Sequence, residues 1–115
     1  MNKEEYRFGF EVYDSAEQLS SEDAWLLQEA RSVTQSAYAP YSNFNVGAVA
    51  KLSNGEMVAG TNQENASYPV GMCAERVLLA SAATLYPNVP IETMAISYHN
   101  MNGDSSHPIS PCGIC

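Results

Sequence analysis

Three cysteines carry the clearest chemical signal in this 115-residue chain. Cys112 and Cys115 form a Cys-x-x-Cys pair, and Cys73 stands alone earlier in the sequence. An odd number of cysteines is a poor basis for a disulfide framework, and a Cys-x-x-Cys pair in a cytosolic protein indicates metal or redox chemistry. Three thiolates on one Zn²⁺ would leave the fourth tetrahedral position open to water, which is typical of catalytic zinc sites.

Glu75 lies two residues after Cys73, close to the predicted metal without being needed as a ligand. A carboxylate there can take a proton from the water on the metal and deliver it to a substrate nitrogen. A glutamate in the first turn of a helix would ordinarily be a surface acid favoured by the helix dipole. Its place between a ligand and a buried helix face favours the role of proton shuttle.

Both cysteine clusters fall at the start of a predicted helix. Residues 73–86 are rich in Ala and Leu and contain no helix breaker before Pro87, which predicts a buried helix beginning at Cys73. Pro111 occupies a position typical of the first turn of another helix. Free N–H groups and partial positive charge at helix N-termini stabilise thiolates. Two such ends facing each other would form a pocket of three thiolates.

The residues before Cys73 predict a helix and a β-hairpin. A hydroxyl cap, an acidic first turn and apolar residues at helical spacing predict a helix over 21–37. Alternation predicts a strand over 44–50, and Asn54-Gly55 predicts a tight type I′ turn. The chain would return as an antiparallel strand over 57–61.

The remaining segments complete the order α-β-β-α-β, followed by the helix that Pro111 would begin. Residues 62–72 read as a loop, and residues 93–98 as a third strand followed by a polar loop. Residues 1–20 form a charged extension whose weak alternation would add an edge strand.

Charge and composition limit the class of partner. The formal net charge is −8, with only five Lys and Arg residues, whereas nucleic-acid binding needs a basic footprint. The 45% hydrophobic content is that of an ordinary globular domain. The N-terminus carries no targeting pattern, and no apolar run approaches the about 18 residues of a membrane span. We therefore expect a cytoplasmic protein that acts on a small molecule, without nucleic-acid or membrane partners.

Four motifs follow one another between about residues 36 and 115. They are Tyr38-Ala39-Pro40-Tyr41-Ser42-Asn43-Phe44-Asn45-Val46-Gly47-Ala48, Asn62-Gln63-Glu64-Asn65-Ala66-Ser67-Tyr68, Cys73-Ala74-Glu75-Arg76 and Pro111-Cys112-Gly113-Ile114-Cys115. In order and spacing this set resembles the short-chain, three-cysteine, zinc-dependent cytidine deaminases. The last two motifs also match the signature of zinc deaminases, a ligand-x-Glu followed by Pro-Cys-x-x-Cys.

The resemblance implies a metal site of one Zn²⁺ bound by Cys73, Cys112 and Cys115. Arg76 would donate hydrogen bonds to the ligand sulfurs. A guanidinium there would restore some of the positive charge that three thiolates and a hydroxide remove from the ion.

The resemblance also implies a nucleoside site. Phe44 would pack beside the substrate, and Asn62 and Glu64 would hydrogen-bond the ribose hydroxyls. Backbone groups around Ala74, together with the Glu75 carboxylate, would recognise the edge of the cytosine base.

The implied reaction is hydrolytic deamination of cytidine and deoxycytidine to uridine and deoxyuridine in pyrimidine salvage, with release of ammonia. A zinc-bound hydroxide would attack C4 while Glu75 protonates N3. The implied fold is α/β, a three-layer α/β/α sandwich with a mixed sheet, assembled as a homotetramer. Family members continue past the Cys-x-x-Cys pair, so residues 21–115 would be a deaminase-like zinc domain truncated at its C-terminus.

Other interpretations remain open from the residues alone. The cysteines could hold a structural zinc in a binding module, with His99 or His107 as the fourth ligand. An aminonucleoside antibiotic deaminase would share the three-cysteine pattern. Phe44 would serve equally as a strand core residue, Asn62 and Glu64 as turn residues, and Arg76 as a surface charge.

Overall fold

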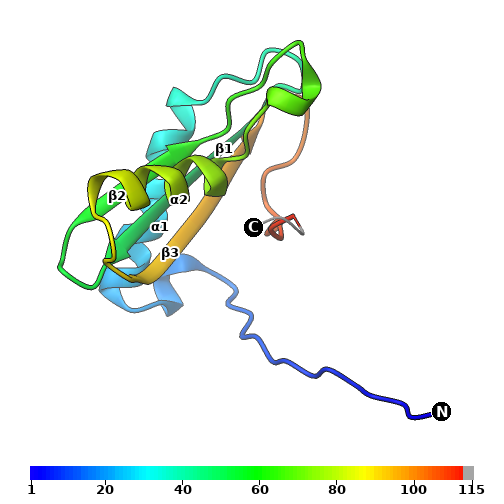
Figure 1. Ribbon diagram of the computed structural model, residues 1–115, viewed down its shortest axis with the longest axis vertical. Coiled ribbons are helices and arrows are strands. Elements are labelled where there is room, and N and C mark those ends of the chain that lie inside the picture. The colour runs from blue at the N-terminus through cyan, green and yellow to red at the C-terminus, as the bar shows by residue number, and fades with distance from the viewer. Residues whose placement is uncertain (113–115) are drawn as a thin grey trace.

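The computed structural model describes residues 1–112, so the predicted ligand Cys115 lies outside the described residues. The main elements in chain order are α1 (Ser21–Val33), β1 (Phe44–Leu52), β2 (Met57–Thr61), α2 (Ala74–Leu85) and β3 (Ile91–Asn100). The strands pair in the order β2-β1-β3, and α1 and α2 lie on opposite faces of the sheet (Figure 1). The expected order of the first five elements and the three-layer α/β/α architecture are therefore confirmed.

The central strand β1 separates two small cores by strict alternation. Ala48, Ala50 and Leu52 are buried under α2, whereas Val49 is buried under α1. Successive residues of a strand point to opposite faces, so one strand can pack against both helices. The alternation that predicted this strand thus also determines which helix each residue meets.

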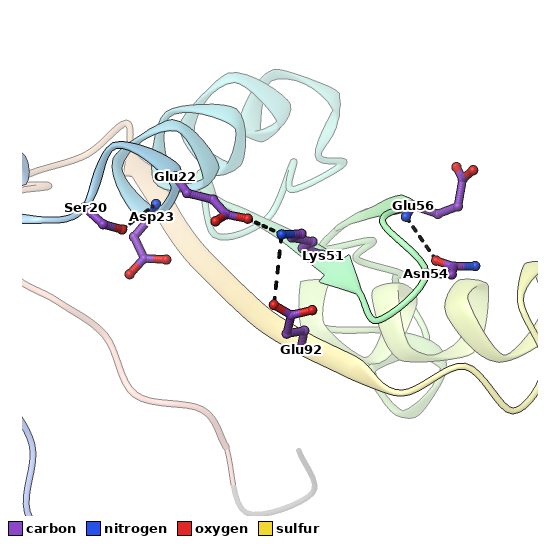
Figure 2. Close-up of polar contacts among 7 residues, drawn as sticks. All are labelled: Ser20, Glu22, Asp23, Lys51, Asn54, Glu56 and Glu92. Atoms are coloured by element: carbon purple, nitrogen blue, oxygen red, sulfur yellow. Dashed lines mark hydrogen bonds and ion pairs between the residues drawn. The ribbon is translucent and has the colours of Figure 1, made fainter.

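Helix α1 begins as its sequence indicates. The Ser20 hydroxyl accepts a hydrogen bond from the Asp23 N–H at 3.2 Å, which caps the first turn. Lys51, near the end of β1, pairs with Glu22 of this helix and lies 4.0 Å from Glu92 (Figure 2). The helix ends in a 3₁₀ turn, Thr34–Ser36, so the predicted span of 21–37 is confirmed with a tighter last turn.

The predicted hairpin is present, but its predicted turn type is wrong. Of the two turn residues, Gly55 alone has a positive φ, +88°, whereas a type I′ turn needs it at both. The Gly55 N–H donates to the Leu52 carbonyl at 3.0 Å, and the Leu52 N–H donates to the Glu56 carbonyl at 2.9 Å. The loop therefore has one residue more than a type I′ turn. The Asn54 side chain accepts from the Glu56 N–H at 3.0 Å instead of turning left-handed (Figure 2).

Both ends of the described chain differ from expectation. Residues 1–15 form no strand, and this extended segment runs away from the sheet (Figure 1). Its apolar side chains do not pack against the sheet or the helices; Phe8, for example, is 87% exposed. Pro111 and Cys112 have no helical structure, so the helix expected to begin at Pro111 is not formed at these two residues.

The three strands of the described sheet are all antiparallel. A parallel contact lies beside the sheet, as an isolated bridge between Tyr38 and Gln63. Because no two strands within residues 1–112 pair in parallel, the mixed sheet stays a prediction. None of the helices in this part of the chain combines the length and hydropathy needed to cross a membrane.

Candidate active site

The N-terminus of α2 is held against β2 by a contact that only glycine permits. A Cβ atom on Gly60 would lie 2.5 Å from both the Ala74 carbonyl oxygen and the Leu78 nitrogen. These are backbone atoms, and Leu78 itself is fully buried. Gly60 lies in β2 and pairs with Ala48 of β1, so the first turn of α2 packs directly on β2.

Cys73 and Glu75 lie together at this helix end. Cys73 is the N-cap of the 12-residue α2 and is half-buried, and Glu75 in the first turn is only 8% exposed. Ala74 between them is completely buried, while Arg76 is exposed. The positive end of the helix dipole favours a thiolate and a carboxylate here. The predicted ligand and the predicted proton shuttle therefore both lie at the N-terminus of α2.

The chemistry of the cysteines fits zinc, although the described residues do not complete the site. Cys112 lies in an exposed segment after β3, and Cys115 lies outside the described residues. Between residues 1 and 112, no three His, Cys, Asp or Glu side chains are grouped closely enough to hold a metal ion. His99 and His107, the alternative fourth ligands, belong to no such group either.

Asn62 is bonded to the first residues of β1 through its side chain. Its Oδ1 accepts from the Val46 N–H at 2.8 Å, and its Nδ2 donates to the Phe44 carbonyl at 2.8 Å. A primary amide has a second donor and a second acceptor site, so one of each remains. The loop that follows is closed by two hydrogen bonds of 2.9 Å between Gln63 and Met72, which brings the chain to Cys73.

Glu64 organises the loop that precedes β1. Its carboxylate accepts hydrogen bonds from the Tyr41 N–H at 3.0 Å, the Ser42 N–H at 3.1 Å and the Ser42 hydroxyl. The Ser42 hydroxyl, followed by the two backbone N–H groups, holds the pKa of Glu64 below its usual value, although burial opposes this. A carboxylate has about four acceptor positions, so one stays available to a ligand hydroxyl.

The Phe44 ring has an aromatic stacking partner that the sequence did not predict. Its ring stacks on that of Tyr98 of β3, with centroids 5.0 Å apart and an interplanar angle of 11°. Tyr98 pairs with Val46, whose side chain packs on the core under α2, so both rings lie on the α2 face. The alternation of β3 could have placed Tyr98 on this face but could not have shown the pairing with Phe44.

A cavity of about 510 Å³ has Tyr98 in its lining but none of Phe44, Asn62, Glu64, Cys73 or Glu75. Its lining includes Arg31, Thr34, Asn45 and His99, at the end of α1 and on the opposite face of the sheet. It contains none of the predicted site residues and no thiol or carboxylate. Because reactive groups define a catalytic site better than volume does, the N-terminus of α2 is the stronger candidate.

The fold and the α2 terminus define a class of protein, a small α/β/α domain with a thiol and a buried carboxylate at one helix start. The family model for the zinc-binding region of cytidine and deoxycytidylate deaminases matches residues 20–115. The chain belongs to this family. The resemblance of its motifs to the cytidine deaminases is thereby confirmed.

Individual relatives agree. A cytidine deaminase of Halalkalibacterium halodurans is 39% identical over 90 residues, which cover 78% of this chain and 64% of the relative. A cytidine deaminase of Mycoplasma genitalium is 33% identical over 91 residues, or 79% of this chain and 65% of the relative. The chain thus spans somewhat less than two thirds of the length of these relatives.

Solved structures extend the likeness to three dimensions. The crystal structure of cytidine deaminase from Burkholderia pseudomallei is 36% identical with a TM-score of 0.70, covering 84% of this chain and 72% of that one. Cytidine deaminase from Mycobacterium tuberculosis gives a TM-score of 0.71 at 29% identity, with 84% and 73% covered.

Proposed function

We propose that the protein is a zinc-dependent hydrolase that converts cytidine and deoxycytidine to uridine and deoxyuridine with release of ammonia. The observation that carries the proposal is the pairing of Cys73, at the N-cap of α2, with the buried Glu75 two residues later. The family membership and the names of the relatives support the same reaction.

The metal would be held by Cys73, Cys112 and Cys115, and when bound it supplies Lewis acidity that activates water. Glu75 accepts the proton of the attacking water and delivers it to N3 of the cytosine ring as the oxygen adds to C4. The remaining proton of the added oxygen passes through the same carboxylate to the exocyclic amine. The C4–N4 bond then breaks as the C4 carbonyl forms, and ammonia leaves. Burial of Glu75 keeps bulk water from competing for its protons.

The substrate would lie across the end of the sheet. Phe44 packs against the nucleoside, Asn62 and Glu64 use their remaining hydrogen-bonding positions on the ribose, and backbone groups at Ala74 meet the base. Since Asn62 and Glu64 are already fixed by the β1 backbone and by Ser42, they are preorganised for this role. Arg76, exposed in the first turn of α2, would donate to the ligand sulfurs.

Assembly as a homotetramer in the cytoplasm, with a role in pyrimidine salvage, is part of the same proposal. Exposed aromatic and aliphatic side chains lie around the site loops, and these are Tyr38, Tyr41, Tyr68 and Val70. Clusters of exposed apolar residues are typical of surfaces that become buried on association.

Ammonia release from cytidine, deoxycytidine, free cytosine and adenosine tests the proposal with the full-length protein. We expect turnover of both pyrimidine nucleosides and a far lower kcat/KM for cytosine, because contacts to the ribose help to position the reacting base. Equal kcat/KM for cytosine and cytidine would refute the ribose roles of Asn62 and Glu64. Absence of turnover on both cytidine and deoxycytidine would refute the function itself.

A further inference from the structure

Tyr98 connects the predicted substrate wall to the segment that carries a predicted metal ligand. Its ring stacks on Phe44 at 5.0 Å. Its hydroxyl donates to the His107 carbonyl and accepts from the His107 N–H at 3.2 Å. One side chain therefore contacts both a residue proposed to touch the nucleoside and the backbone that leads to Cys112.

The loop between Tyr98 and His107 is closed by further hydrogen bonds. The Asn100 N–H donates to the Ser105 hydroxyl at 2.9 Å, and the Met101 N–H donates to the Asn43 carbonyl at 2.9 Å. These bonds close the loop on itself and hold its start beside the segment that precedes β1. The position of His107 against Tyr98 is thus supported from both sides of the loop.

The chain from His107 to Cys112 is short and stiff. Pro108 and Pro111 fix two φ angles, and the residues before them are confined to extended conformations. The two prolines reduce the number of conformations open to this segment. Anchoring His107 therefore restricts where the Cys112 thiol can lie.

We infer that Tyr98 is a positioning residue with two separable parts, an inference that rests on the proposed function. Its ring holds Phe44 flat against the α2 face, where Phe44 would contact the nucleoside. Its hydroxyl fixes the His107–Cys112 segment, so that the Cys112 thiol is delivered to the metal with little loss of conformational freedom. The ring acts on substrate binding, and the hydroxyl acts on metal retention.

Two variants of the full-length, zinc-loaded protein separate these parts. Tyr98→Phe keeps the ring and removes the hydroxyl, so zinc should pass to a chelator about fivefold more readily, and the His107 amide should exchange faster by a similar factor. The KM for cytidine should change less than about twofold in this variant. Tyr98→Leu also removes the stacking, which should raise KM about threefold or more while kcat of the zinc-loaded protein stays within about twofold.

Tyr86→Phe is the matched control. The Tyr86 hydroxyl also donates a hydrogen bond, to Glu56 at 3.2 Å, but it lies at the other end of α2. Zinc retention, amide exchange at His107 and KM should all stay at the values of the unmodified protein.

Unchanged zinc retention and His107 exchange in Tyr98→Phe would overturn the role of the hydroxyl. An unchanged KM in Tyr98→Leu would overturn the role of the ring. Failure of the unmodified protein to deaminate cytidine would overturn the proposed function instead, and the zinc and exchange measurements would still decide the role of the hydroxyl.

Discussion

Gly60→Ala should damage the active site through the backbone rather than through any reactive group. The new Cβ would lie 2.5 Å from backbone atoms of Ala74 and Leu78, whereas ordinary van der Waals contact begins at 3.4 Å. Helix α2 would therefore have to withdraw by about 1 Å, and overpacking of this kind costs about 1–3 kcal/mol of unfolding free energy. Gly60 has no left-handed φ, so the loss would come from the close approach alone.

The displacement should affect turnover more than stability. Cys73 and Glu75 lie at the N-terminus of the helix that must move, and a displacement of about 1 Å can lower a rate by about a hundredfold. Thermal or denaturant unfolding gives the stability loss, and initial rates on cytidine with saturating zinc give kcat/KM.

Gly9→Ala is the matched control, because a Cβ on Gly9 meets nothing within 4 Å. It should leave both stability and kcat/KM unchanged. If Gly60→Ala behaved like Gly9→Ala in both measurements, the claim that β2 positions the α2 terminus would be wrong.

Two further predictions concern the carboxylates. Glu75→Gln preserves the shape of the side chain but cannot carry a proton. Zinc content should therefore stay near one per chain while kcat falls by about 10²–10⁴-fold. Near-normal turnover would assign the proton transfer to another group. The lowered pKa of Glu64 means that its contribution to folding stability is complete above its usual value of 4.5 and is lost as the pH falls through its lower folded value. Glu64→Gln should therefore flatten the fall in unfolding free energy as the pH is lowered below 4.5, as measured by urea unfolding. An equally steep fall would show that the Ser42 contacts do not stabilise the carboxylate.

Local patterns were sufficient to predict most of the fold. Alternation identified β1 because successive residues of a strand point to opposite faces, and here each face packs against one helix. The Ala- and Leu-rich run after Cys73 identified α2 because that helix is buried along one side. The hairpin turn was misjudged because Asn54-Gly55 suits both a two-residue and a three-residue loop. The register of β1 against β2 decides which of the two loop lengths forms. That register depends on side-chain packing far from the turn.

Contacts between distant residues could not be predicted. The Asn62 side chain bonds to β1, and the Tyr98 ring stacks on Phe44, although neither pair is close in sequence. The apolar alternation of the N-terminal segment was equally misleading, since Tyr6, Phe8 and Phe10 remain exposed and form no strand. An alternating pattern specifies which side chains of a strand share a face. To form a strand, the segment must also hydrogen-bond to the edge of an existing sheet.

Zinc X-ray absorption on the full-length protein tests the central claim most directly, because the proposed chemistry requires a metal with one position open to water. We predict one zinc per chain with three sulfur ligands and one lighter atom, and the lighter atom should change when a cytidine analogue is added. Four protein ligands that do not change with the analogue would indicate a structural zinc and contradict the proposed hydrolytic site.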